Sequence, residues 1–266
     1  MLMGAKKILK LYMRYFKLNL ASQMEYRVSF IVQVFGMVLN NASFIFFWWV
    51  AFDITGSDIA GYSMRDVMFI WAVASSAFGF ASILFANVSQ ISSLIITGEL
   101  DTFLLQPMPV LANLLGARTQ VSAWGDFIYG WVILFIFWDV SVGILSIFLL
   151  SIILGAVIFV SVKIIFHTLT FYLGYAQMIT SAASEFMISF SIYPEGIFTG
   201  FVRLLIYSLL PAAFVTHIPL DLVKDFDISK FVIWILFAVV HFIIACWFFG
   251  KGLKKYESGN LIITRM

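Results

Sequence analysis

Two acidic side chains stand inside long apolar runs of this sequence, where a charge is costly to place. Asp126 lies in the run 120–138, and Glu185 lies near the end of the run 164–189. A charge at the centre of a bilayer costs about 2.5–3.5 kcal/mol on insertion scales, so such residues usually line a polar pathway or pair across a helix interface. We therefore treat Asp126 and Glu185 as candidates for a substrate pathway, with structural pairing as the alternative.

Three amide side chains in the apolar run 28–52 raise the same question. Gln33, Asn40 and Asn41 could join helices by hydrogen bonds, which contribute about 0.6 kcal/mol each in membranes. They could equally give a substrate path a polar lining. The sequence leaves both roles open.

Motifs for nucleotide or metal binding are missing from the sequence. Neither G-x-x-x-x-G-K-[ST] nor G-x-G-x-x-G occurs, so if ATP drives this protein, another chain binds the nucleotide. His167, His217 and His241 are scattered and lack acidic or cysteine partners at ligand spacing, so no metal site is expected. The single Cys246 sits in an apolar run, where a packing role is expected. A membrane enzyme would need clustered His, Asp or Glu, and no such cluster occurs.

The composition places these residues in a membrane protein. The chain is 62% hydrophobic and 11% charged, with a mean hydropathy of +1.03, whereas a soluble domain carries about 25% charged residues. The 30 Phe and 8 Trp suit lipid-facing and interfacial positions. The net charge of +2 is too small to indicate nucleic acid as a partner.

Apolar runs long enough to cross a bilayer predict an all-α fold in one membrane domain, residues 1–266. Before the last run, Pro194, Pro211 and Pro219 divide residues 191–230 into pieces too short to span, which predicts a broken, partly re-entrant segment on the outer side. The second run is rich in Ala, Ser and Gly, which let helices approach closely. The six predicted transmembrane helices cover residues 28–52, 67–90, 120–138, 142–162, 164–189 and 231–249.

The start of the chain predicts an amphipathic helix over residues 5–25 rather than a cleavable signal. Lys7, Lys10, Arg14 and Lys17 recur at helical spacing on one face, and apolar and aromatic residues fill the other. Such a helix lies in the membrane interface with its basic face towards anionic headgroups, so membrane lipid is an expected partner.

Lys and Arg set the expected orientation of the six spans. With the N-terminus inside, both termini are cytoplasmic, and 12 of the 16 Lys and Arg fall on the inner side. The outer side then holds Arg65, Lys224 and Lys230, and Arg203 is ambiguous. The inner residues are Lys6, Lys7, Lys10, Arg14, Lys17, Arg27, Arg118, Lys163, Lys251, Lys254, Lys255 and Arg265.

One polar stretch between spans, residues 97–118, is patterned as structured. Gly98 can turn the chain, and acids at a helix start are favoured by the helix dipole. Two prolines stop the helix and stiffen the turn. The apolar Phe-Leu-Leu in between suits either a docking surface for a cytoplasmic partner or contact with lipid headgroups. The candidate docking residues are Glu99, Leu100, Asp101, Leu104, Leu105, Pro107 and Pro109, joined by Lys7, Lys10 and Arg14 of the basic helix.

With these features the chain resembles the permease subunits of ABC-2-type exporters, in a bacterial branch with six spans and no fused ATPase. The resemblance covers nearly the whole length. It rests on the basic helix, on the pattern G-E-L-D-x-x-L-L-x-P at 98–107, on the Pro-containing outer segment, and on G-L-K-K-Y-E-S-G-N at 252–260.

The resemblance implies a bacterial plasma (inner) membrane protein that is itself not an enzyme. Two permease chains, identical or related, would pair with two cytoplasmic ABC ATPase subunits, which would bind ATP and Mg²⁺; this chain would need no cofactor. The basic helix and the 97–118 loop would touch the ATPases, and the substrate would be amphipathic or lipid-like.

A secondary transporter or channel using Asp126 and Glu185 is the alternative. It would need an intramembrane charge relay or a repeated pore motif. The halves of the sequence show no internal repeat, which argues weakly against transporters built from inverted repeats.

Overall fold

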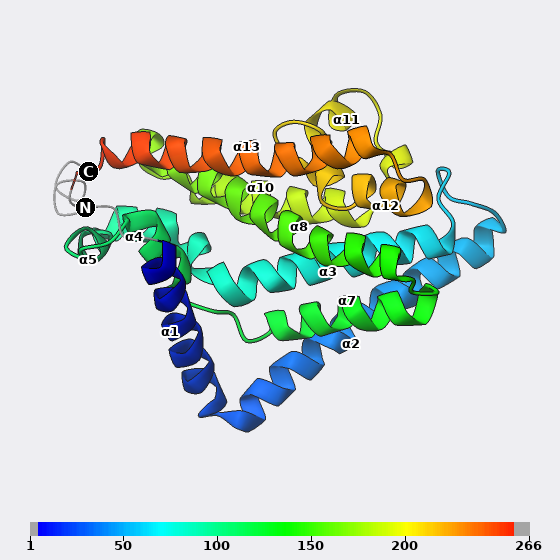
Figure 1. The fold of residues 1–266 in the computed structure, drawn as a ribbon, viewed down its shortest axis with the longest axis horizontal. Helices are drawn as coiled ribbons and strands as arrows, with labels where there is room; N and C mark the ends of the chain where they lie inside the picture. The colour runs from blue at the N-terminus through cyan, green and yellow to red at the C-terminus, as the bar shows by residue number, and fades with distance from the viewer. Residues whose placement is uncertain (1–4, 258–266) are drawn as a thin grey trace.

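The computed structural model describes residues 5–257, with side chains from Lys10 onward, and the described chain is helical with no strand. This confirms the all-α prediction. The helices form an elongated bundle (Figure 1). Their bounds are α1 Ala5–Met24, α2 Arg27–Thr55, α3 Met64–Phe85, η1 Ala86–Gln90, α4 Ile91–Thr97, α5 Asp101–Leu104, α6 Val110–Gly116, α7 Ala123–Phe137, α8 Val142–Thr168, α9 Thr170–Leu173, α10 Gln177–Ile192, η2 Glu195–Ile197, α11 Gly200–Ile206, η3 Ala212–Phe214, α12 His217–Lys224 and α13 Ile228–Leu253.

Helix α3 is the centre of the bundle and packs against α7 and α8. Glycines allow the close approach of α3 and α7. A Cβ on Gly79 would lie 2.6 Å from the backbone nitrogen of Phe127, and a Cβ on Gly130 would lie 2.4 Å from the carbonyl oxygen of Ala72. The small residues of the second apolar run therefore do what the sequence predicts, because they bring helix backbones together.

Four helical stretches of the described chain are long and apolar enough to cross a membrane: 27–55, 64–97, 142–173 and 228–253. Helix α7 is apolar but only 15 residues long. At 1.5 Å per residue it rises about 22 Å, less than the roughly 30 Å of a hydrocarbon core. The structure thus supports a polytopic membrane fold, and the number of six spans stays a prediction.

The division between the fourth and fifth predicted spans is wrong. Helix α8 does not end near Lys163 but continues to Thr168, and Gly174, at φ +74°, separates it from α10, which begins at Gln177. Lys163 is tolerated inside the helix because its ammonium donates a hydrogen bond to Ser89 Oγ at 3.1 Å and lies over the Phe78 ring. A lysine that looks like a helix end in the sequence is therefore an interior residue with partners.

The segment 191–230 contains short helices, and its re-entrant path on the outer side stays a prediction. Pro194 and Pro211 stand immediately before η2 and η3. Pro219 does not end a helix. It lies in the first turn of α12, where backbone N–H groups make no hydrogen bond within the helix, so proline is tolerated. The Trp234 indole of α13 donates to the Phe214 carbonyl at 2.7 Å, which fixes this segment on the bundle.

Different segments of the chain form the two ends of the bundle (Figure 1). The loop end comprises residues 91–118, which form α4, α5 and α6, and α1 and the last turns of α13 lie beside it. The cap end comprises residues 56–66, 138–141 and 194–227, which include α11 and α12. The predicted docking stretch and the predicted outer segment thus lie at opposite ends of the molecule.

Candidate functional site

The docking stretch is a compact hairpin of short helices at the loop end. Gly98, at φ +77°, ends α4, a conformation that favours glycine. The Leu100 amide then donates back to the Leu94 carbonyl at 3.0 Å, and the single turn α5 follows. Asn113 of α6 donates to Gln106 Oε1 at 2.7 Å and closes the hairpin across its two prolines.

The tip of this hairpin exposes apolar side chains. Leu105 is 86% exposed and Leu104 42% exposed, and Pro107 and Pro109 beside them are exposed as well. Glu99 is also exposed. A proline-stiffened apolar tip with an acid beside it has the composition of a contact surface rather than of a flexible loop.

Leu100 and Asp101 do not belong to that exposed tip. Leu100 is fully buried in the core cluster, so it anchors the hairpin, which corrects the sequence prediction that it contacts a partner. Asp101 lies beside Tyr256: burial and then this carboxylate raise the pKa of the Tyr256 hydroxyl to about 12. The pattern at 98–107 and the described part of the pattern at 252–260, residues 252–257, therefore meet here in space.

Helix α1 is fastened along the hairpin by neutral hydrogen bonds. The Tyr12 hydroxyl donates to the Ala112 carbonyl at 2.6 Å, and the Tyr15 hydroxyl donates to the Asn113 side-chain oxygen. Further along α1, the amides of Asn19 and Gln23 donate to backbone carbonyls of residues 116 and 119, at 3.3 and 3.1 Å. These four donors follow helical spacing, so one face of α1 docks on α6 and the chain after it.

The contact between α1 and α6 is close. A Cβ on Gly116 would lie 2.8 Å from the Tyr12 ring. Burial, and then the neighbouring Tyr15 and Cys246, raise the pKa of the Tyr12 hydroxyl to about 12, so it remains a donor at neutral pH. Helix α1 and the hairpin therefore form one rigid surface.

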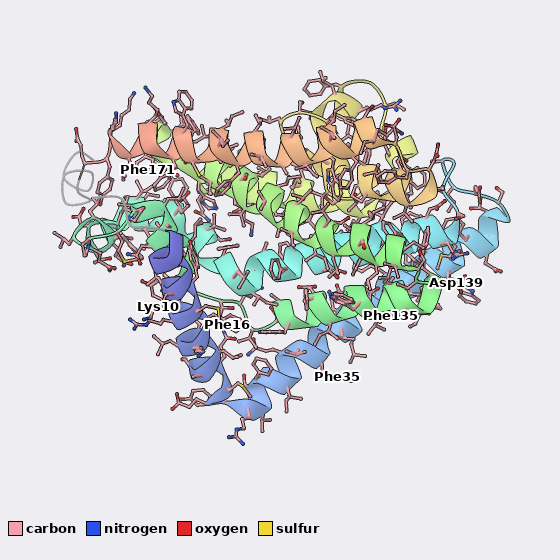
Figure 2. The ribbon with its side chains drawn as sticks, in the orientation of Figure 1. Lys10, Phe16, Phe35, Phe135, Asp139 and Phe171 are labelled. Atoms are coloured by element: carbon pink, nitrogen blue, oxygen red, sulfur yellow. The ribbon has the colours of Figure 1, made fainter. Side chains whose placement is uncertain are left out.

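The basic face of α1 points away from this contact. Lys10 and Arg14 are exposed, and Figure 2 shows Lys10 on the side of α1 facing away from the bundle. The side chain of Lys7 lies outside the described residues. The basic face of α1 and the apolar tip of the hairpin thus both lie at the loop end, on different sides of it.

A buried polar cluster joins the hairpin to the long helices. Ser92 of α4 is 2.7 Å from His167 Nδ1 of α8, and Thr170 of α9 donates to Ser92 Oγ at 2.8 Å. All three side chains are buried. Sequence reasoning missed this joint because the partners are far apart in the chain; the only signal was His167, a polar residue inside an apolar run.

Asp126 is paired with an amide of α2. Asn41 donates to its Oδ1 at 2.7 Å, and the Tyr129 hydroxyl donates to the Asn41 carbonyl at 2.9 Å. Asp126 and Asn41 are buried, and Asp126 lies in the first turn of α7. Of the two roles open for Asn41, the structure supports hydrogen bonding between helices.

The other pathway candidates do not join Asp126. Gln33 and Asn40 are exposed on α2, and the Gln33 amide donates to Ser29 of its own helix. Glu185 is exposed on α10, which packs on α8 and α3, whereas Asp126 faces α2. The structure therefore does not bring the two acids into one relay.

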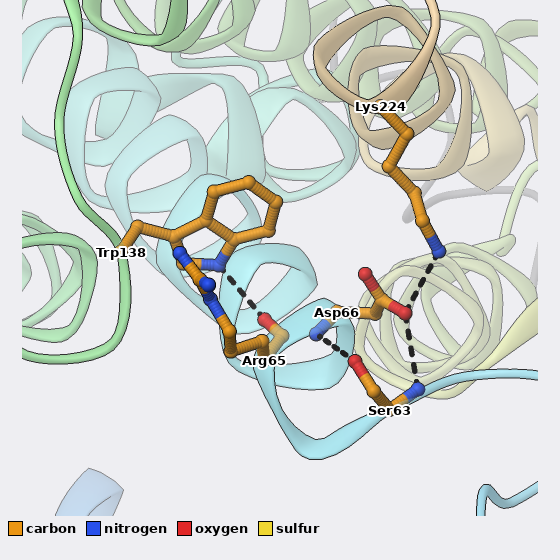
Figure 3. Close-up of polar contacts among 5 residues, drawn as sticks. All are labelled: Ser63, Arg65, Asp66, Trp138 and Lys224. Atoms are coloured by element: carbon orange, nitrogen blue, oxygen red, sulfur yellow. Dashed lines mark hydrogen bonds and ion pairs between the residues drawn. The ribbon is translucent and has the colours of Figure 1, made fainter.

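The cap end is built from charged contacts (Figure 3). Ser63 and Asp66 form a capping box at the start of α3, and Lys224 of α12 reaches Asp66 Oδ2 at 2.8 Å. The Trp138 indole donates to the Arg65 carbonyl at 2.9 Å. Further ion pairs here are Arg65–Asp139, Arg203–Glu195 and Lys230–Asp221, at 3.3, 2.9 and 3.3 Å.

Comparison with known proteins gives a family match. A family model described as "ABC-2 family transporter protein" matches residues 38–259, most of the chain. No curated protein and no solved structure matches it. The matched region contains the hairpin, the polar joint, the cap end and every helix from α3 to α13.

Proposed function

Because the chain belongs to the ABC-2 family of transporter proteins, we propose that it is the permease subunit of an ATP-driven exporter. Separate cytoplasmic ATPase subunits bind ATP and Mg²⁺ and drive this chain, which moves an amphipathic or lipid-like substrate outward by alternating access. A second permease chain, identical or related, completes the pathway. The loop end faces the cytoplasm, and the cap end faces outward.

The observation that carries this proposal is the exposed apolar tip on a braced hairpin. Leu104 and Leu105 project from a turn that is stiffened by two prolines and anchored by buried Leu100. Exposed apolar side chains on a rigid support are what a protein contact uses as anchors. The ATPase docks on this tip, and α1 extends the docking surface.

The same contacts give the docking surface a path to the transmembrane helices. The Ser92–His167 joint ties α4 to α8, and the hydrogen bonds of Tyr12 and Tyr15 tie α1 to α6. A displacement of the hairpin by the ATPase therefore moves α8 and α1 together. This is the mechanical link that alternating access requires, and it needs no acid relay through Asp126.

The test is a double substitution of the tip, Leu104→Ser with Leu105→Ser. The matched control is Leu204→Ser with Leu209→Ser, because these cap-end leucines are 63% and 54% exposed. Removing one anchor residue from an interface costs about 2 kcal/mol, which is a factor of about 30 in affinity, so the double substitution should weaken binding by a factor of about 30 to 1,000. Co-purification of the ATPase and transport in proteoliposomes are the two readouts.

We expect the tip variant to insert and remain stable but to lose its ATPase and its transport, while the control keeps both. Normal transport by the tip variant would refute the assignment of this surface. Transport by the purified chain driven by a proton gradient, without any ATPase, would favour a secondary transporter.

A further inference from the structure

Helix α2 lies along one edge of the bundle and packs on α7 with its inner face (Figure 1). On this face Asn41 bonds to Asp126, and a Cβ on Gly125 of α7 would lie 2.6 Å from the Val34 carbonyl oxygen. An apolar stretch of 18 residues in α2 is only 6% buried by the described chain, against 78% for the stretch within 64–97. Most of the surface of α2 is therefore free to contact lipid or another protein.

This free surface has two sides of different chemistry. One side carries large apolar side chains such as Phe35, which is 61% exposed and suits contact with lipid. Gln33 is exposed on nearly the opposite side, because two residues turn a helix by about 200°. Exposed polar side chains follow Gln33 along α2 at separations of three, four or seven residues, which keeps them in line. This polar line consists of Ser29, Gln33, Asn40 and Ser43.

The two amides of the polar line have hydrogen-bonding groups that α2 leaves unused. Gln33 donates to Ser29 Oγ at 3.0 Å, and the Ser43 hydroxyl donates to the backbone carbonyl of Asn40 at 2.6 Å. Within the part of the chain that the structure describes, the side-chain oxygen of Gln33 and the carboxamide of Asn40 have no partner. Lipid hydrocarbon offers none either, so these amides favour association with another polar segment.

We propose that the polar line of α2 is the surface through which this chain pairs with a second copy of itself. Two copies inserted in the same orientation are related by a two-fold axis along the membrane normal, so a residue beside the axis faces its counterpart at the same depth. A carboxamide both donates and accepts, so Gln33 and Asn40 each pair with the same residue of the second copy. Ser29 and Ser43 are small and let the two helices approach closely.

This inference rests on the proposed function and deepens it, because it identifies the second permease chain as a copy of this one. It also gives a common role to Gln33 and Asn40, which do not join Asp126. The polar line and the apolar tip at Leu104 and Leu105 are separate segments of the chain, so pairing and ATPase docking can be tested independently.

The first experiment is oxidative cross-linking of the full chain in membranes without any ATPase. Cys246→Ser removes the only cysteine in the sequence, and Gln33→Cys or Asn40→Cys then places a single thiol on the polar line. Phe35→Cys is the control, because this residue lies at a similar depth on the apolar side of α2. A disulfide forms only where the two Cβ atoms come within about 4.5 Å, so the reaction reports the face that pairs.

We expect disulfide-linked dimers of the chain from positions 33 and 40 and none from position 35. The absence of dimers from both polar positions, or equal dimer formation from position 35, overturns the proposal. Cross-linking of positions 33 and 40 only to a different protein also overturns it, because the second chain is then not a copy. The proposed function would survive each of these results, since co-purification of the ATPase with the tip variant decides it separately.

The second experiment measures how much the amides contribute to pairing. Gln33→Leu with Asn40→Leu removes both, and Phe35→Leu with Phe46→Leu is the control, at positions that are 61% and 65% exposed on the same helix. Energy transfer between donor- and acceptor-labelled copies in liposomes of increasing lipid content gives the dissociation constant. Each lost hydrogen bond between helices weakens association about threefold, so the constant of the amide variant should rise about tenfold. An unchanged constant, or an equal rise in the control, overturns the proposal as well.

Discussion

The two ends of the bundle hold their elements together with different chemistry. At the loop end, uncharged donors of α1, among them Tyr12 and Tyr15, bond to α6, and an exposed apolar tip extends beyond. At the cap end, the ion pairs Lys224–Asp66 and Arg203–Glu195 join separate segments. Neutral hydrogen bonds do not respond to salt or to moderate acid, whereas ion pairs do. We therefore expect the contacts of the loop end to change little with salt and moderate acid, and those of the cap end to respond to both.

The largest expected effect at the cap end is a response to pH through His217. Burial lowers the pKa of this imidazole from 6.5 to about 4. Between these two pH values His217 is protonated in the unfolded state but neutral in the folded state. The free energy of unfolding therefore decreases as pH falls from 6.5 to 4, by about 3 kcal/mol at most. Thermal unfolding of wild type and His217→Phe from pH 7.5 to 4 checks this.

His217→Phe should remove most of that pH dependence because phenylalanine does not titrate. The ring packs beside Tyr62, so an apolar ring of similar shape keeps the contact. A pH profile that is identical in wild type and variant would show that the acid sensitivity arises elsewhere.

The next effect tests the loop end. Gly116→Leu would drive a side chain into the Tyr12 ring and lift α1 from the hairpin, at a cost of about 1–3 kcal/mol. The measurement is the rate of tryptic cleavage at Arg14 and Lys17, together with the melting temperature. Gly36→Leu is the control, because a Cβ at Gly36 meets no atom within 4 Å. Equal cleavage of both variants would contradict the docked position of α1.

A smaller effect is expected from Asp66→Asn at the cap end. The substitution weakens the capping box and the contact with the half-exposed Lys224, which together contribute about 1–2 kcal/mol. Urea unfolding at 0.05 and 0.5 M NaCl should show a difference from wild type that shrinks with salt. Asp53→Asn, at an exposed position of α2, should change nothing.

The smallest effect is expected from Lys230→Gln. Its partner Asp221 is 3.3 Å away, and both side chains are about half exposed, so the pair contributes under about 0.5 kcal/mol. Unfolding curves of wild type and variant should overlay. A loss comparable to that of Asp66→Asn would show that the cap-end pairs act as one network.

The sequence predicts those helices and turns that depend on the pattern of neighbouring residues. The apolar runs located α2, α3 and α13, the helical spacing of basic residues located α1, and Gly98 with two prolines located the hairpin. Prediction from the sequence is wrong where the local structure depends on contacts with residues far away in the chain. The sequence predicts a helix end at Lys163, because its contacts with Ser89 and Phe78 come from residues more than 70 positions away.

The same limit applies to the candidate site. The exposed tip at Leu104 and Leu105 follows from the local pattern. The burial of Leu100 and the joint of Ser92 with His167 depend on packing across the bundle. A polar residue within an apolar run signals that it needs a partner but not which one, as Asn41 and Asp126 also illustrate.

The central claim is that the apolar tip of the loop end contacts the ATPase. The most direct measurement places a photo-reactive amino acid at Leu105, or at Leu209 of the cap end as a control, and irradiates native membranes. Mass spectrometry then identifies the attached protein. We predict a cross-link from position 105 to a protein with a Walker A motif, and none from position 209. No such cross-link at 105, or equal cross-linking at both positions, would contradict this account.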